Sequence, residues 1–286
     1  MTEQEFLNNY NITAFDRPSV TTDIVLFTLD RNQTDVRKIN IQGLQVLLIK
    51  RGNHPFRNKW ALPGGFCIPS ETSLETARRE LQEETGVTQP YLQPVGVYSE
   101  PDRDPRGWIL SNAYMGIVQK ADCKLCADTD AWEAAWFTVT DLQTGRNWRN
   151  WHSQNTFTAN YLLTLQREHS KEKLLVKWQE TYELQTTFVK TGHKLLHHDL
   201  AFDHGLIIGE TLQDLLKNIR FDPRNIFPFF PETFTIGELR TCYEMLTQTK
   251  APNFRRTILP YITETQDTVS NTGYHPAKIY KRKPTL

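Results

Sequence analysis

The sequence has few cysteines, no net charge and no long apolar run. Four cysteines in 286 residues are too few for a disulfide framework, and the single Cys123/Cys126 pair lacks a second pair to complete a zinc site. Lys plus Arg and Asp plus Glu both number 33, so the whole chain has no net field for nucleic acid or an anionic membrane. No stretch approaches the roughly 18 apolar residues of a membrane span, and the acidic start lacks the pattern of a signal peptide. We therefore expect a cytoplasmic protein with no membrane partner.

The composition predicts a globular chain, and the charge is unevenly distributed along it. Hydrophobic residues make up 38% and aromatic residues 11%, enough to bury a sizeable core and to exclude a wholly disordered scaffold. The length corresponds to about two domains. Residues 250–286 contain seven basic and two acidic side chains, so this end carries about +5 and the remainder about −5.

The first half of the chain alternates strands with one clear helix. Residues 22–29 and 44–49 are β-branched and aliphatic runs that predict strands, as do residues 95–99, 109–119 and 134–139. From Ser73 onward Leu74, Ala77 and Leu81 recur at helical spacing until Gly86 ends the helix.

The second half is expected to be mainly helical. In the block 146–198, residues 158–167 and 171–184 favour helices. Asp203 can cap a helix over 204–220. Thr235 and Glu238 form a capping box that opens a helix to about residue 248. Residues 253–262 predict a short helix, and residues 273–283 a β-like run.

One segment carries recognisable chemistry. Residues 65–87 read GFCIPSETSLETARRELQEETGV. Glu80, Glu83 and Glu84 fall within about a 100° arc of one helix, where like charges repel. Carboxylates are hard ligands, and Mg²⁺ takes one or two of them together with water and substrate phosphate. The alternative is a solvated acidic helix face, but the spacing favours a Mg²⁺ or Mn²⁺ site for hydrolysis of a diphosphate bond.

This segment resembles the Nudix box at every defining position, so the chain is similar to the Nudix hydrolases, which cleave nucleoside diphosphates linked to another moiety. The resemblance covers about residues 20–140 and implies an α/β/α sandwich with a mixed sheet. It implies that Glu80 and Glu84 bind the metal with Glu83 assisting, and that Gly65 contributes through its backbone. Arg79 is implied to orient Glu71 or the glutamates.

Further residues are candidates for substrate binding and proton transfer. The loop at 101–107 resembles that of Nudix proteins that handle ADP-ribose, and Arg103 and Arg106 could bind phosphate or ribose through their forked donors. The alternative for this loop is a charged turn with internal ion pairs. The other candidates are Arg51 and Phe56 for the substrate, with Trp60 and Trp136 expected in the core, and Glu133 and Asp130 as general bases.

The basic end has the order of a winged helix-turn-helix: a capped helix, a turn, a second short helix and a β-like end. The expected phosphate-contacting side chains are Asn253, Arg255, Arg256, Lys278 and Lys281. A small solvated helical cap is the alternative.

Both ends together resemble the Nudix-related transcriptional regulators of NAD metabolism, in which a Nudix domain senses ADP-ribose or a related metabolite and a winged helix binds operator DNA, usually as a homodimer. The segments that carry this likeness are LAFDH at 200–204, FTIGEL at 234–239, NFRR at 253–256 and PAKIY at 276–280. We therefore expect an α+β protein with a Nudix domain over 1–145, a helical insertion or linker over 146–198, a linking helix over 199–224 and a winged-helix domain over 225–286.

Two functions follow, and they are compatible. The first is a Mg²⁺-dependent hydrolase of ADP-ribose or a related nucleotide sugar, supported by the intact box. The second is a ligand-responsive regulator of transcription that binds double-stranded DNA and uses its Nudix domain as the sensor. A sensor without catalytic activity is the alternative to the first. A third interpretation makes the basic end a dimerisation module.

Overall fold

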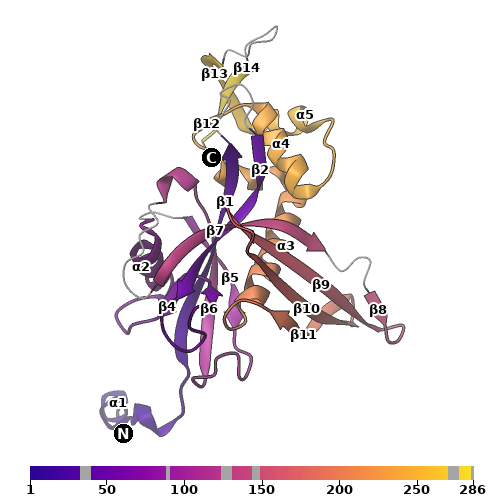
Figure 1. Cartoon of the computed structure of the whole chain (residues 1–286). Helices are drawn as coiled ribbons and strands as arrows, with labels where there is room; N and C mark the ends of the chain where they lie inside the picture. Colours follow the sequence, from indigo (N-terminus) through magenta and orange to yellow (C-terminus); the bar gives the residue numbers. More distant parts are fainter. Residues whose placement is uncertain (33–39, 88–90, 124–130, 144–148, 270–276, 285–286) are drawn as a thin grey trace.

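The computed structural model of this chain describes residues 1–32, 40–87, 91–123, 131–143, 149–269 and 277–284. Its first part is rich in strands, and its last part contains most of the helices (Figure 1). The elements up to residue 143 are α1 (Glu3–Asn9), η1 (Ile12–Ala14), β1 (Ser19–Asn32), β2 (Asn40–Arg51), β3 (Trp60–Ala61), β4 (Gly64–Phe66), α2 (Ser73–Thr85), β5 (Tyr91–Tyr98), β6 (Ile109–Ile117), η2 (Lys120–Asp122) and β7 (Ala131–Gln143). Those after it are β8 (Arg149–Trp151), β9 (Thr156–Arg167), β10 (Lys173–Leu184), β11 (Phe188–His198), α3 (His204–Phe221), η4 (Pro223–Phe229), β12 (Thr233–Phe234), α4 (Ile236–Thr247), α5 (Phe254–Ile258), η5 (Leu259–Tyr261), β13 (Ile262–Val269) and β14 (Ala277–Arg282).

A large mixed sheet is the scaffold of the molecule. Its strand order is β11-β10-β9-β7-β2-β1-β6-β5, and the short strands β3, β4 and β8 pair at its margins. β1 runs parallel to β6 and antiparallel to β2. The strands expected in the first half of the chain are confirmed, although β1 and β2 are longer than their apolar runs because polar residues also take part in the pairing.

The two faces of this sheet are covered by different helices. Successive side chains of a strand point to opposite faces. Ile24 and Leu26 of β1 pack in one apolar cluster with Leu81 of α2, whereas Val25 and Phe27 belong to the cluster that contains α3. This arrangement, with helices on both sides of a mixed sheet, confirms the predicted α/β/α sandwich.

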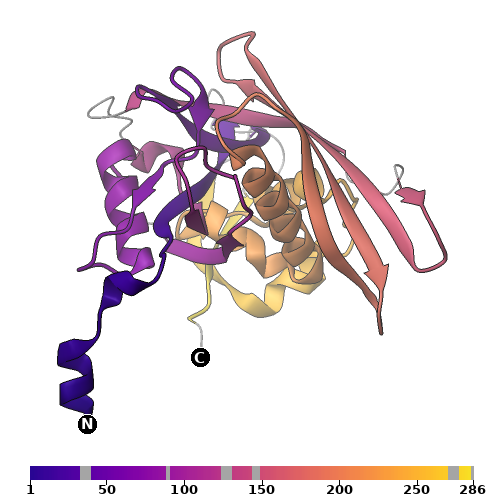
Figure 2. The same cartoon turned by 90° about the horizontal axis from the view of Figure 1, so that it is seen from below.

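The expectation of helices in the block 146–198 is wrong, because the chain there forms β9, β10 and β11. Leu174, Val176 and Trp178 are buried while the residues between them are more exposed, which is the two-residue period of a strand. Residues such as Leu, Glu, Lys and Gln favour helices in isolation, but strand pairing outweighs that preference here. Figure 2 shows that these strands continue the sheet and curve around α3.

The helix α3 approaches this added sheet closely through its glycines. A Cβ atom at Gly209 would lie 2.5 Å from the buried indole of Trp178 in β10. We therefore expect Gly209→Ala to destabilise the fold by about 1–3 kcal/mol through overpacking. Gly237→Ala in α4 is the matched control, because the nearest atom to its Cβ would be 3.8 Å away. Urea denaturation of both variants measures the difference, and equal stabilities would contradict this packing.

The last part of the chain forms a small helical unit with a three-stranded sheet. α4 begins with the predicted Thr235–Glu238 capping box, and α5 follows with Asn253 before its first turn. The strand order β12-β14-β13 completes a winged helix-turn-helix, as the sequence predicts. One apolar cluster contains Leu212 of α3 and Leu239 of α4 together with residues of β1, so this unit shares a core with the large sheet.

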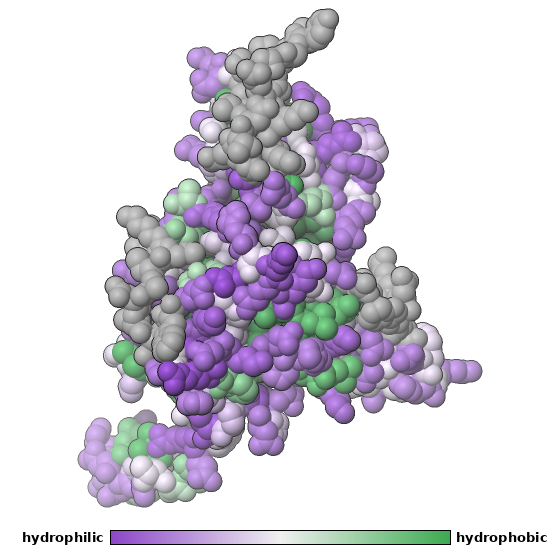
Figure 3. All heavy atoms as spheres, in the orientation of Figure 1, coloured by the Kyte–Doolittle hydropathy of each residue, from purple (hydrophilic) through white to green (hydrophobic). Residues whose placement is uncertain are grey.

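The amino-terminal helix α1 stands away from the body, as Figures 1 and 3 show. None of its residues is buried, and its exposed apolar side chains include Phe6 and Leu7. Among the described residues, no helix has the length and apolar character needed to cross a membrane.

Candidate functional site

The site is built on the short strand β4 and the helix α2 that follows it. Gly64 has a φ of 150°, and a Cβ atom there would meet the Thr22 carbonyl oxygen at 2.0 Å. A Cβ atom at Gly65 would lie 2.3 Å from Oε1 of Glu80. Only glycine leaves room for this close approach. The chain therefore brings the Gly65 backbone against the carboxylates of α2.

Arg79 organises the acidic face of α2. Its Nε donates to Oε1 of Glu71 at 3.0 Å, and its Nη1 donates to Oε1 of Glu80 at 2.7 Å and to Oε2 of Glu83 at 3.3 Å. The hydrogen bond to Glu71 raises the pKa of Arg79, with smaller contributions from Glu80. The structure thus brings these four side chains together.

Glu84 is the most buried glutamate of the helix, with 8% of its surface exposed. Its Oε2 accepts a hydrogen bond from the Gly64 amide at 2.9 Å. Its pKa is raised to about 8, chiefly by burial and also by the negative charges of Glu80 and Asp23, against the lowering effect of that amide. Burial also raises the pKa of Glu80. The carboxylates are crowded in a way that a bound cation would relieve.

A cavity of about 430 Å³ opens beside these carboxylates. Its walls come from β1, α2, the loop at 101–107 and the start of α3. A larger cavity of about 900 Å³ lies between β6, α3 and η4, but Arg282 and Asp122 are its only charged lining residues among those described. The smaller cavity is therefore the candidate site, because it contains Glu80, Glu83 and Glu84.

Positively charged side chains also line the cavity. Arg51 and Arg106 line the cavity, and their guanidinium carbons lie 4.9 and 5.5 Å from the ring centre of Phe202. Burial, and next the charge of Arg106, lower the pKa of Arg51. Arg106 also pairs with Asp104 at 2.7 Å, an ion pair within the loop. Phe56 lies behind this wall, with its ring centre 4.8 Å from that of Phe202.

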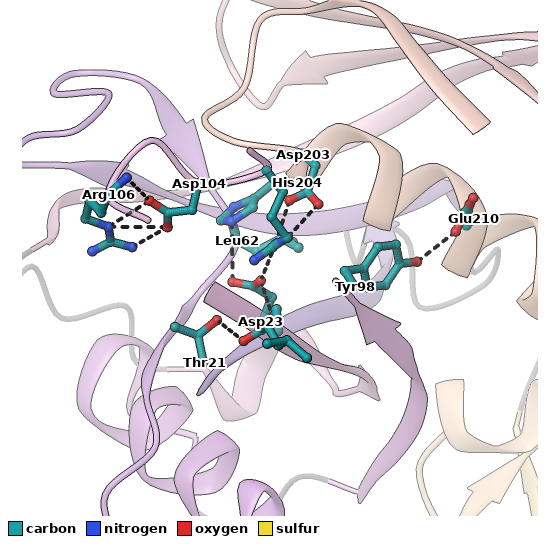
Figure 4. Close-up of polar contacts among 12 residues, drawn as sticks. Thr21, Asp23, Leu62, Tyr98, Asp104, Arg106, Asp203, His204 and Glu210 are labelled. Atoms are coloured by element: carbon teal, nitrogen blue, oxygen red, sulfur yellow. Dashed lines mark hydrogen bonds and ion pairs between the residues drawn. The ribbon is translucent and has the colours of Figure 1, made fainter. Parts of the chain in front are cut away.

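Arg103 binds two carboxylates from separate parts of the chain. Its Nε and Nη2 donate to the two carboxylate oxygens of Asp203 at 2.8 and 2.6 Å, and Nη2 lies 3.5 Å from Asp23. Asp203 occupies the N-cap position of α3 but makes no side-chain capping bond, so the expected capping role is wrong. Figure 4 shows Asp23, Asp203 and His204 joined in one network of polar contacts.

Glu133, one of the two candidate general bases, is not among the residues that line the cavity. It forms ion pairs with Lys50 and Arg167 instead. Asp130, the other candidate, lies outside the described residues. Trp60 and Trp136 are 2% and 3% exposed and belong to the core, as expected.

The basic side chains expected to contact DNA lie on α5 and β14. Arg255 donates to the Tyr280 hydroxyl at 3.4 Å, and Lys278 pairs with Glu264 at 2.7 Å. Arg256 and Lys281 are exposed, and neither forms an ion pair with another described residue. Asn253 precedes α5 and makes no side-chain capping bond there.

Sequence reasoning missed Asp23, Phe202 and His204 as members of the site. Asp23 is a carboxylate within an apolar strand, and it is only 7% exposed. That contrast is a usable signal, because a charged group is rarely buried without a partner. Phe202 and His204 lie in the LAFDH segment at 200–204. Nothing in the sequence around them shows that they line the same cavity as residues of the first half of the chain.

Known proteins share both parts of this architecture. Residues 32–161 match the NUDIX domain, and residues 226–281 match the NrtR DNA-binding winged helix domain. The ADPR responsive transcriptional repressor NtrR of Acinetobacter baylyi is 26% identical over 284 residues, which cover 98% of this chain and 88% of that protein. The ADP-ribose pyrophosphatase of Methanocaldococcus jannaschii is 45% identical over 98 residues, which are 34% of this chain and 57% of that enzyme.

A solved structure matches almost the whole chain. The MutT/nudix family protein from Enterococcus faecalis has a TM-score of 0.65 and 28% identity, and the match covers 99% of this chain and 94% of that one. The two domain matches lie in the same order as the two units of the fold. The chain therefore carries a NUDIX domain followed by an NrtR-type winged-helix domain.

Proposed function

We propose that the protein hydrolyses the diphosphate bond of ADP-ribose or a related nucleotide sugar with the help of Mg²⁺ or Mn²⁺. One observation carries this proposal: one cavity is lined both by Glu80, Glu83 and Glu84 and by the guanidinium groups of Arg51 and Arg106. Burial, and next the charges of Glu80 and Asp23, raise the pKa of Glu84, while burial, and next the charge of Arg106, lower the pKa of Arg51. A divalent cation beside the carboxylates and a diphosphate beside the guanidinium groups would supply counter-charge to each set.

The donor set fits one hard divalent cation. Glu80 and Glu84 would bind it, with Glu83 and the Gly65 backbone beside them. Among the described residues no three acidic, His or Cys side chains form a ready-made metal cluster. That suits Mg²⁺, which takes one or two carboxylates and fills its other positions with water and substrate phosphate. When bound, the ion would polarise a phosphoryl oxygen and offset charge on the diphosphate.

The side chains of the cavity would bind and orient the rest of the substrate. Arg51 and Arg106 are placed to donate to phosphate oxygens, for which a guanidinium fork is well shaped. Arg79 holds Glu80 and Glu83 in position. Water adds across the P–O–P bond, so that ADP-ribose yields AMP and ribose 5-phosphate. The likeness to an ADP-ribose pyrophosphatase and to an ADPR responsive repressor supports this substrate.

A direct assay tests the hydrolase. The purified protein is incubated with Mg²⁺ and ADP-ribose, and in parallel with NADH, other nucleotide sugars and nucleoside triphosphates, while AMP release is followed by chromatography. We expect AMP release from ADP-ribose that stops when EDTA removes the metal. Tight binding of ADP-ribose without turnover would instead make the site a sensor.

We also propose that the winged helix binds double-stranded DNA as part of a transcriptional regulator. The exposed Arg256 on α5 and Lys281 on β14 favour this second function, together with the match to a DNA-binding winged helix domain. A homodimer would place two such units on two half-sites. Light scattering of the purified protein measures the oligomeric state, and a monomer would contradict the dimer.

Binding to DNA should depend strongly on salt and on these two side chains. We expect Arg256→Ala and Lys281→Ala each to weaken binding to the protein's own promoter and to reduce the salt slope by about one. Lys217→Ala, at an exposed position of α3, is the matched control. Fluorescence anisotropy at several salt concentrations measures both effects. Equal affinity for the promoter and for random DNA would remove the proposed regulatory role.

A further inference from the structure

The segment at 201–204 closes the cavity although it lies far beyond the NUDIX match at 32–161. Phe202 and His204 line the cavity, and Asp203 contacts Arg103 in its wall. Phe202 has a φ of 51°, an uncommon conformation for a bulky residue. The same segment starts α3, whose other end continues through Asp222 into η4 and the winged unit. One end of this helix therefore lies at the site and the other at the DNA-binding domain.

The guanidinium group of Arg103 binds the carboxylate of Asp203 through two parallel donors, an arrangement that would also suit a phosphate. Both of its hydrogen bonds to Asp203 are 2.8 Å or shorter, and its side chain is only 5% exposed. A guanidinium binds carboxylate and phosphate through the same pair of parallel donors. Asp203 and an incoming phosphate would therefore compete for Arg103.

A second contact attaches the start of α3 to the site. Nδ1 of His204 accepts a hydrogen bond from the Leu62 amide at 2.8 Å, so the proton of this ring lies on Nε2. Nε2 is 3.4 Å from Oδ1 of Asp23, and Asp23 also receives a hydrogen bond from Ser111. Asp23 thus contacts both Arg103 and His204. Asp23 therefore connects the side chain of Arg103 to the first residue of α3.

We propose that Arg103 and Asp203 couple occupancy of the cavity to the winged helix, with Asp203 as a positioning residue. This inference rests on the proposed binding of a diphosphate in the cavity. The diphosphate draws the Arg103 fork away from Asp203, which is then free to cap the amides of α3. The first turn of α3 changes its contacts with the sheet, and α3 passes the change to α4 through their shared core. Neither residue needs to touch DNA.

The experiment measures DNA binding with and without ligand. Affinity for the protein's own promoter fragment is determined by fluorescence anisotropy with EDTA present, so that ADP-ribose is not consumed. Calorimetry of the same samples measures ADP-ribose binding. In the wild type we expect saturating ADP-ribose to shift the DNA dissociation constant by about tenfold. In Asp203→Asn the shift should fall below about twofold while ADP-ribose still binds. Asp214→Asn, which removes a charge from an exposed position of the same helix, should behave as the wild type.

The results distinguish failure of the proposed Arg103–Asp203 coupling from failure of the proposed binding of ADP-ribose. A full tenfold shift in Asp203→Asn would overturn the coupling and leave the proposed function intact. The same holds if wild-type protein binds both ADP-ribose and DNA without any shift. A wild type that fails to bind ADP-ribose in calorimetry would overturn the proposed function, and the coupling with it.

Hydrogen exchange of the wild type provides a measurement that does not depend on a variant folding. We expect ADP-ribose to change the exchange rates of amides at 204–210 by several-fold, because the capping contacts at the start of α3 are rearranged. The amides of β9 and β10 serve as an internal reference, because these strands pair along their length. Unchanged exchange at 204–210 with ADP-ribose bound would overturn the coupling.

Discussion

Replacing Glu84 with glutamine is expected to lower kcat for ADP-ribose hydrolysis by about 10²–10³-fold, the scale on which removal of a single electrostatic stabiliser acts. Glutamine keeps the shape of the side chain and can still accept the Gly64 amide hydrogen bond, so the fold should be retained. It lacks the negative charge that would bind the divalent ion at this buried position. Steady-state kinetics with Mg²⁺ measures the loss, and circular dichroism checks the fold.

Glu75→Gln is the matched control for this substitution. Glu75 lies on the same helix, but it is exposed and belongs to the capping box with Thr72, where glutamine is also accepted. Its kcat should stay at the wild-type value. Glu83→Gln is expected to lose activity as well, because Arg79 holds Glu83 beside Glu80. Wild-type turnover in both Glu83→Gln and Glu84→Gln would remove the proposed site.

Without metal, the wild-type protein is expected to lose stability as the pH rises from about 4.5 to about 8. The pKa of Glu84 is about 8 in the fold and 4.5 as an unperturbed group, because burial disfavours the charged form. Between these values the folded state keeps a proton that the unfolded chain has released, so each pH unit costs about 1.4 kcal/mol. By pH 7 the cost is about 3 kcal/mol.

Comparison with Glu84→Gln isolates this contribution, because all other titrating groups are shared. Urea denaturation at pH 5 and pH 7 in EDTA should show a steeper loss of unfolding free energy in the wild type than in the variant. Mg²⁺ should then raise the Tm of the wild type at pH 7 and leave that of the variant nearly unchanged. If the unfolding free energy changed equally with pH in the two proteins, the expected destabilisation by ionised Glu84 would be contradicted.

Much of the site could be predicted because its pattern is local. Glu80, Glu83 and Glu84 share one helix face by spacing alone, and Thr72 and Gly86 mark the ends of that helix. The winged unit was predicted for the same reason, since its capping box and its order of elements lie within about 50 residues. By contrast, β9 and β10 contain many residues of high helix propensity, and they form strands because they pair with each other and with β7 and β11 on either side.

The sequence by itself determined the glutamate-bearing helix α2, the two-domain order and the basic end, because each depends on residues three or four apart or on a short run of elements. Only the tertiary structure decided that Arg103 meets Asp203 and that Asp23 meets His204. These partners lie 100 and 181 residues apart, and their meeting depends on how β1, the loop at 101–107 and the start of α3 pack around one cavity. Long-range packing determines which charged residues surround the glutamates, and the local spacing of residues in the sequence does not predict that set.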